Sequence, residues 1–350
     1  MQENIILLII SFILTLFLAS YLRPMAIKVG LVDLPSQRKH HSGEVPLLGG
    51  VAMGVTFLAV LILSGVPLDG YRVLIGGGLL LIFVGVLDDI HELSATARMV
   101  IQISVALLMV TLDGVVSASL GNLLGLGSIE MDAWAIPFTV LAVVGVINAV
   151  NMSDGIDGLA GGIVLIAVAF LALVAALSGR TSDLTVLMVL IGVVAGFLIY
   201  NFPSRFSNQS KIFMGDSGST LLGFLVVWFM LSLSQGEGSE LRPVTALWIL
   251  AYPIMDMAAI MIRRKLKGRS LFAPDREHLH HVFLLTGYSS RKTVTTLLLI
   301  NLLLGSIGIV SQIMGVAEYV MFYAFLLLML AYLFALRHAW KLMRAIKSDG

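Results

Sequence analysis

Amide and carboxylate side chains recur in one polar segment, residues 148–158, which lies between two long apolar runs. They follow each other at intervals of three residues: Asn148, Asn151, Asp154 and Asp157. Three residues rotate an α-helix by about 300°, so these side chains converge only if the helix tightens or breaks. Gly155 and Gly158 permit a break. Carboxylates at a membrane boundary are costly, which favours a functional site over the alternative of a solvated connecting loop.

Three other carboxylates lie at the ends of apolar runs and are candidates for binding a divalent cation. Asp88 and Asp89 follow the apolar run 79–87, and Asp216 precedes the apolar run 217–234. Mg²⁺ is usually held by one or two carboxylates together with water and phosphate oxygens. The alternative for each is a helix-capping or solvated acid. Because three such residues are expected at the same membrane face, we predict a metal site.

Cationic and aromatic side chains near these acids suit an anionic ligand that carries a base. The loop 23–45 contains a compact cationic group, formed by Arg38, Lys39, His40 and His41. This group suits phosphate, although topology or anionic lipid head groups explain it equally well. Phe213, three residues before Asp216, is suited to stack on a base or to pack in the core.

The basic loop 263–292 has the same ambiguity. It contains three histidines within four positions, His278, His280 and His281, and it suits a polyanion. His278 and His281 have the spacing for a transition metal, and such a loop also orients a membrane chain. Asp256 differs, because it lies inside an apolar run and either pairs with a buried cation or lines the site.

The elements that must position these residues are membrane-spanning helices. The chain has 350 residues, of which 58% are hydrophobic and 12% charged, and it contains no Cys. This composition predicts an all-α polytopic bundle and excludes disulfides and thiolate metal sites. About eleven apolar segments are long enough, or nearly so, to span. They cover 4–22, 46–65, 71–87, 98–112, 134–150, 159–178, 184–200, 217–234, 244–262, 293–314 and 316–336.

The distribution of Lys and Arg predicts the orientation of the bundle. All of them except Arg72, Arg180 and Arg242 fall in one set of alternate loops and in the C-terminal tail. That asymmetry places the N-terminus outside and the C-terminus in the cytoplasm. The same loops (23–45, 88–98, 148–158, 201–216 and 263–292) carry the candidate chemistry. A transporter would place its ionisable residues near the bilayer midplane, so an enzyme acting at the cytoplasmic surface is favoured.

The motifs together resemble a known family, the polyprenyl-phosphate N-acetylhexosamine-1-phosphate transferases. The resembling stretches are 33–50, 88–89, 148–158, 213–219, 246–264 and 274–281. The resemblance implies one integral-membrane transferase domain over residues 1–350 in a bacterial inner membrane. It implies UDP-GlcNAc and undecaprenyl phosphate as substrates, Mg²⁺ (or Mn²⁺) as cofactor, no nucleic acid, and a homodimer as one possible assembly.

The resemblance also assigns residues. Asp88, Asp89 and Asp157 are expected to be catalytic, and Asp216 with Asp89 is expected to hold the metal. The expected substrate-binding residues are Lys39, Asn148, Asn151, Asp154, Asn201, Phe213, Arg264, Arg276, His278, His280 and His281. Glu92 departs from the family pattern, which has Asp there.

The expected reaction is direct attack of the lipid phosphate on UDP-GlcNAc, as the first membrane step of O-antigen or common-antigen synthesis. Alternatives with the same chemistry are another UDP-linked N-acetylhexosamine, or a product that feeds teichoic-acid synthesis. A covalent aspartyl intermediate is a second mechanism. A transporter of lipid-linked or sugar-phosphate cargo and an intramembrane aspartyl protease are the other function classes; the protease is disfavoured because no glycine stands two residues before Gly215.

Overall fold

The computed structural model describes residues 2–34, 43–204, 211–235, 240–270 and 277–348. Helices dominate these ranges, and the strands β1 (Val32–Asp33) and β2 (Val45–Pro46) form one short antiparallel pair. The chain divides into two compact units: unit 1, residues 1–118 with 131–241, and unit 2, residues 119–130 with 242–350. The expectation of one transferase domain over residues 1–350 stays a prediction.

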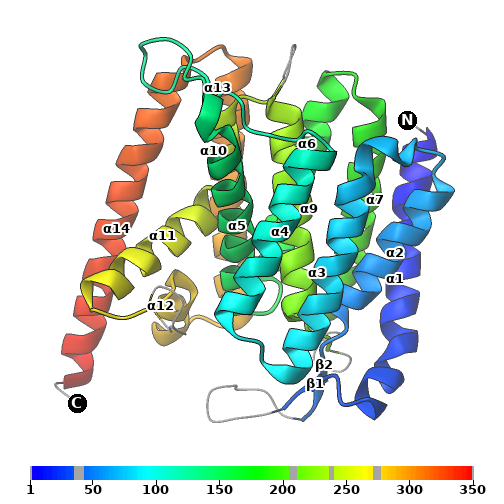
Figure 1. Ribbon diagram of the computed structural model, residues 1–350. Helices are drawn as coiled ribbons and strands as arrows, with labels where there is room; N and C mark the ends of the chain where they lie inside the picture. The colour runs from blue at the N-terminus through cyan, green and yellow to red at the C-terminus, as the bar shows by residue number, and fades with distance from the viewer. Residues whose placement is uncertain (1, 35–42, 205–210, 236–239, 271–276, 349–350) are drawn as a thin grey trace. The chain divides into compact units, whose positions relative to one another are not determined.

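Unit 1 is a helical bundle built around one buried helix. Its helices are α1 (Gln2–Lys28), α2 (Gly49–Leu63), η1 (Leu68–Tyr71), α3 (Arg72–His91), α4 (Ala95–Leu112), η2 (Asp132–Trp134), α5 (Ala135–Ser153), α6 (Leu159–Leu177), α7 (Thr181–Asn201) and α9 (Gly215–Ser234). Helix α9 is buried along 94% of its apolar stretch, and it packs against α2, α3, α5 and α6. Helices α1 and α7 lie side by side (Figure 1).

Glycines let two neighbours approach the first turn of α9 closely. A Cβ atom on Gly85 of α3 would lie 2.3 Å from the Cα atom of Ser217. A Cβ atom on Gly50 of α2 would lie 2.3 Å from the backbone nitrogen of Gly218. Small residues permit such backbone contact between membrane helices. The start of α9, where Asp216 lies, is therefore held between α2 and α3.

A polar network holds the opposite end of α9. The Asp183 carboxylate accepts a 2.6 Å hydrogen bond from the Tyr71 hydroxyl and pairs with Arg180 at 2.6 Å. Arg180 also donates to the Ser232 carbonyl at 2.8 Å. This network joins η1, α7 and the C-terminal end of α9.

Unit 2 contains the last five described helices: α10 (Pro243–Ile249), α11 (Ala251–Leu266), α12 (Leu279–Leu285), α13 (Ser290–Ile313) and α14 (Glu318–Ser348). Helices α10 and α11 meet at Leu250 with a bend of 81°. The Trp248 indole N–H donates to the Met321 carbonyl at 3.1 Å, which joins α10 to α14. A second small cluster, Ala259, Val282 and Leu336, packs α11, α12 and α14 together.

The helices confirm the predicted fold class, an all-α polytopic membrane protein. Within the described ranges, 9 helices are long and apolar enough to cross a membrane, or 10 if the bent pair α10–α11 counts as one span. Helix α2, with 15 residues, is shorter. Each apolar segment expected from the sequence coincides with a helix, and segment 244–262 covers the bent pair. The orientation across the membrane stays a prediction.

Candidate active site

The break expected in the segment 148–158 is present. Helix α5 ends at Ser153, Asp154 follows as its C-terminal cap residue, and α6 begins after Gly158. Gly158 has a φ of +80°, a conformation that favours glycine. Asn148 and Asn151 therefore lie on α5, whereas Asp154 and Asp157 lie in the turn.

Asn201 connects this turn to the segment that precedes α9. Its Oδ1 accepts the Gly158 N–H at 2.7 Å, and its Nδ2 donates to the Ile212 carbonyl at 2.9 Å. The side chain is 2% exposed. Both ends of the amide are therefore used within the fold, and the geometry gives Asn201 a positioning role; the predicted substrate contact stays a prediction.

Asp216 lies at the centre of the convergent polar residues. Its Oδ1 accepts a 2.6 Å hydrogen bond from Asn151 Nδ2, and its Oδ2 lies 3.5 Å from the Arg98 guanidinium. Asn151 also contacts Ser219 at 2.8 Å. The Asp216 side chain is 33% exposed, so it stays accessible to a ligand.

Asp88 shares Arg98 with Asp216. The Arg98 guanidinium lies 2.9 Å from Asp88 Oδ2, and the Leu93 N–H donates to Asp88 Oδ1 at 2.7 Å. Asp88 is 5% exposed. Since both of its oxygens are engaged and it is buried, the geometry favours Asp88 as a group that holds Arg98 in place. Its predicted catalytic role stays a prediction.

Asp89 faces the first turn of α9. Its Oδ1 accepts the Asp216 N–H at 2.9 Å, and its Oδ2 accepts the Ser217 hydroxyl at 3.2 Å. The first N–H groups of a helix have no partner within it, and a carboxylate is stabilised there. Asp89 thus caps α9 from α3, an arrangement that competes with its predicted metal-binding role.

Asp157 pairs with a lysine that also contacts the candidate base-stacking residue. Lys211 Nζ lies 2.6 Å from Asp157 Oδ2 and 4.6 Å from the centre of the Phe213 ring. The Phe213 N–H donates to the Pro46 carbonyl and the Phe213 carbonyl accepts the Gly49 N–H, so this residue lies beside the end of strand β2. Phe213 is partly exposed, which leaves room for a stacked base; that role stays a prediction.

The site carries more negative than positive charge. Five carboxylates surround it, those of Asp88, Asp89, Asp154, Asp157 and Asp216. Within the described ranges their ion pairs involve two cations, Arg98 and Lys211. The pKa of Asp154 is raised well above its usual value, first by burial and then by Asp216, Asp157 and Asp89.

The donor set fits a hard divalent cation. All five carboxylates offer oxygen atoms, which Mg²⁺ and Mn²⁺ prefer. Among the described residues no group of three His, Cys, Asp or Glu side chains converges on one metal position. Mg²⁺ needs no such group, because it commonly uses one or two carboxylates and completes its shell with phosphate oxygens and water. The same finding gives no support to the transition-metal alternative for His278 and His281.

Asn148 and Asn151 point to different partners, although they lie one turn apart on α5. Asn148 donates to Gln102 of α4 at 2.7 Å and to the Val144 carbonyl at 2.7 Å. Asn151 alone reaches Asp216. The substrate contact predicted for Asn148 stays a prediction.

The predicted residues of unit 2 form a cluster of their own. His278, His280 and His281 lie at the start of α12 with their rings against one another, and Arg264 is buried in the last turn of α11. Asp256, left undecided by the sequence, pairs with His278 at 2.7 Å. Lys39 and Arg276 lie outside the described residues, as do Arg38, His40 and His41.

Sequence reasoning missed Arg98 and Lys211. In the sequence, both residues contribute only to the Lys and Arg asymmetry that predicts the orientation. The available signal was position: Arg98 lies in the first turn of α4, ten residues after Asp88, and Lys211 lies two residues before Phe213. A cation at the end of an apolar helix near carboxylates is a candidate partner for them.

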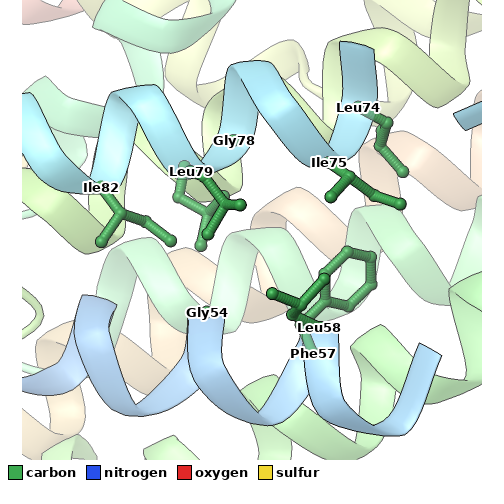
Figure 2. Close-up of a pocket in the computed structure, with 9 residues that line it drawn as sticks. Gly54, Phe57, Leu58, Leu74, Ile75, Gly78, Leu79 and Ile82 are labelled. Carbon is green, nitrogen blue, oxygen red and sulfur yellow. The ribbon is translucent and has the colours of Figure 1, made fainter. Parts of the chain in front are cut away.

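A shallow apolar pocket in unit 1 is separate from these polar residues. It lies between α2 and α3 (Figure 2), with a lining of Gly54, Phe57, Leu58, Leu74, Ile75, Gly78, Leu79, Ile82 and Leu221. None of these side chains can exchange a proton or bind a phosphate. The pocket therefore carries no chemistry itself.

Comparison with known proteins gives a consistent result over nearly the whole chain. Residues 71–234 match the family described as Glycosyl transferase family 4. The chain is similar to the undecaprenyl-phosphate alpha-N-acetylglucosaminyl 1-phosphate transferase of Escherichia coli K12, with 38% identity over 343 residues (97% of this chain, 93% of the relative). The proteins of the same name from Yersinia pestis and Haemophilus influenzae are each 36% identical, over 97% and 93% of this chain and 93% and 92% of their own lengths.

Proposed function

This chain belongs to Glycosyl transferase family 4, and from that membership we propose that it transfers GlcNAc-1-phosphate from UDP-GlcNAc to undecaprenyl phosphate. The products are undecaprenyl-diphospho-GlcNAc and UMP. The relatives named for this reaction match nearly the full length of the chain, including the segments that carry the histidines and Arg264. The protein is a multi-pass membrane enzyme, as its lipid acceptor requires.

One structural observation carries the proposal. Carboxylates from α3, from the turn after α5 and from α9 meet at one end of unit 1, where Arg98 and Lys211 pair with them. Both substrates are anionic, so the reaction requires charge neutralisation and alignment of the attacking phosphate. A net negative site accepts such substrates only together with added positive charge. This supports Mg²⁺ (or Mn²⁺) as the cofactor.

Asp216 is the best placed candidate to hold the metal, because it is partly exposed and lies between Asn151 and Arg98. Asp89 was predicted to help it, but both Asp89 oxygens face the start of α9. Bound Mg²⁺ would supply charge neutralisation to the diphosphate as UMP leaves.

The proposed reaction is a direct displacement. An oxygen of the lipid phosphate forms a bond to the β-phosphorus of UDP-GlcNAc, and the bond from that phosphorus to the bridging oxygen breaks. The bridging oxygen leaves with UMP. Arg98, held by Asp88, contributes positive charge beside Asp216. Lys211, held by Asp157, contributes positive charge beside Phe213.

The geometry favours this route over a covalent aspartyl intermediate. Asp88 has both oxygens engaged, and Asp157 pairs with Lys211 at 2.6 Å, so each carboxylate is a weakened nucleophile. Exchange of labelled UMP into UDP-GlcNAc without lipid acceptor is the test. Exchange supports the covalent route, and strict dependence on undecaprenyl phosphate supports direct attack.

We further propose a bacterial inner-membrane location with the active site at the cytoplasmic face. The Lys and Arg asymmetry supports it, because the site loops are the basic loops. Labelling of single cysteines tests it: the chain contains no Cys, so one introduced at Asp69 and one at Glu92 report opposite ends of α3 without a background signal. Only the Asp69 position should react with a membrane-impermeant thiol reagent applied from outside.

The test of function is release of UMP by the purified protein. Release should require UDP-GlcNAc, undecaprenyl phosphate and Mg²⁺ together, and Asp216→Ala should abolish it. Near-normal activity of Asp216→Ala would refute the metal assignment. Parallel assays with UDP-GalNAc and UDP-MurNAc-pentapeptide test the sugar preference. Release of UMP also distinguishes a transferase from a transporter, because a transporter would release no UMP.

A further inference from the structure

Asp256 is a buried carboxylate to which three other residues donate. It lies in α11, is 3% exposed, and accepts hydrogen bonds from the Tyr332 hydroxyl at 2.6 Å and from the Leu279 N–H at 3.2 Å. Its other oxygen lies 2.7 Å from His278 Nδ1. A carboxylate this deeply buried needs partners of this kind, because an uncompensated buried charge is costly. Asp256 therefore joins three helices of unit 2: α11, the start of α12, and α14.

This arrangement determines how His278 is presented. The oxygen that faces His278 is a hydrogen-bond acceptor, so Nδ1 carries a proton. The nitrogen left to meet a ligand is Nε2. Carboxylate–histidine pairs commonly fix an imidazole in this way, in one tautomer and one ring orientation. The Leu279 N–H bond holds the neighbouring backbone as well, so the ring and the chain that carries it share one anchor.

The orientation of the His278 ring also affects the other two histidines, because their rings pack against one another. The His278 and His280 rings are stacked, with centres 5.4 Å apart and an angle of 12° between the planes. The His281 ring lies 4.2 Å from the His280 ring. Loss of the anchor on His278 would therefore change the position of all three rings.

His280 is the most deeply buried ring of the cluster. It is 1% exposed, and within the described part of the chain neither ring nitrogen has a hydrogen-bond partner. Burial, together with His281 and His278, lowers the pKa of His280 to about 3, whereas Asp256 opposes this shift. The ring is thus neutral at physiological pH, and a neutral imidazole offers one donor and one acceptor. Hydroxyl and amide groups of a sugar match such a pair.

We propose that Asp256, supported by Tyr332, is a positioning residue that fixes the orientation of the histidine cluster for binding of UDP-GlcNAc. The inference rests on the proposed function, because it takes UDP-GlcNAc as the ligand. It assigns a role to the last membrane helix, α14, through Tyr332. Tyr332 lies 76 residues from Asp256 in the sequence.

The kinetic test uses the full-length enzyme in detergent micelles with Asp256→Asn, Tyr332→Phe and, as a matched control, Tyr323→Phe. Tyr323 is an exposed tyrosine on the same helix. Asp256→Asn should raise the KM for UDP-GlcNAc about tenfold or more and leave the KM for undecaprenyl phosphate unchanged, since a misplaced contact group weakens the donor interaction. Tyr332→Phe should change the same KM in the same direction by a smaller factor, and Tyr323→Phe should have no effect.

A spectroscopic test separates this inference from the proposed function. In protein with ¹⁵N-labelled histidine, a His278→Gln difference spectrum identifies the His278 signals. The wild type should show a protonated Nδ1, and Asp256→Asn should give a mixture of tautomers, because the Asn amide can also donate. This readout needs no substrate turnover, so it stays informative if UDP-GlcNAc is not the donor. Unchanged tautomers, or a donor KM within twofold of wild type in both variants, would overturn the inference.

Discussion

The carboxylate of Asp89, at the end of α3, accepts the backbone N–H of Asp216, at the start of α9, at 2.9 Å. The two residues lie 127 positions apart in the sequence. One acid therefore fixes the helix turn that presents the other. The adjacent acids Asp88 and Asp89 have different partners, because the Asp88 carboxylate accepts hydrogen bonds from Arg98 and from the Leu93 N–H.

Substitutions at Asp89 should separate capping from metal binding. Asn keeps a capping oxygen, so Asp89→Asn should retain most of the stability, whereas Asp89→Ala should cost about 1 kcal/mol. We expect the Mg²⁺ concentration for half-maximal rate of Asp89→Asn to stay within about threefold of wild type. Thermal unfolding in detergent and Mg²⁺ titrations of the initial rate measure both quantities, with Asp69→Ala as an exposed control. A tenfold rise in the Mg²⁺ requirement at unchanged stability would identify Asp89 as a ligand.

Gly215 should tolerate no side chain. Its φ is +72°, and a Cβ atom there would lie 2.5 Å from Asp89 Oδ2. Gly215→Ala should therefore lose about 1–2 kcal/mol from backbone strain alone, and it should also lower kcat. Gly76→Ala is the matched control, because a Cβ atom there meets nothing within 4 Å and Ala favours a helix interior. Equal melting temperatures for the two variants would contradict the packing described here.

Removal of the Arg98 guanidinium should damage activity more than stability. Arg98 is 37% exposed, so we expect a loss of about 1–3 kcal/mol in Arg98→Ala, less than for a fully buried pair. The value of kcat/KM should fall about 100-fold, because charge beside Asp216 is lost and Asp88 is left unpaired. Arg72→Ala, at the other end of α3 and 72% exposed, should be neutral. Steady-state kinetics and thermal unfolding distinguish these outcomes.

Asp154 should make the ligand-free enzyme less stable as the pH rises. Its pKa is raised in the folded state, so the unfolded chain releases this proton first, near pH 4. The contribution of Asp154 is thus most favourable below that pH and is lost progressively as the pH rises through the folded-state pKa. Asp154→Asn removes the charge and should raise the melting temperature at pH 8 by about 1–2 °C for each kcal/mol relieved. A variant with the same pH dependence as wild type would contradict this assignment.

The membrane helices and the break after α5 were predictable, because apolar run length and glycine position are local features of the chain. Several hydrogen-bond partners of the site residues could not be predicted from the sequence. The cap that Asp89 provides, the bond from Asn151 to Asp216 and the bond from Tyr332 to Asp256 each join residues far apart in sequence. Such pairs depend on which helices pack together and in which register. An isolated Tyr in an apolar run carries no sign of this, since aromatic residues are common in membrane helices.

The deep burial of α9 has a consequence for how the enzyme responds to its membrane. Only 17% of the apolar stretch of α1 is buried, compared with 94% for α9. A change in bilayer thickness acts on lipid-facing helices through hydrophobic mismatch, and these respond by tilting. Helix α9 is enclosed by α2, α3, α5 and α6 and meets little lipid, so Asp216 is shielded from this force. The chemistry should therefore proceed similarly in thin and thick bilayers, while α1 adjusts its tilt.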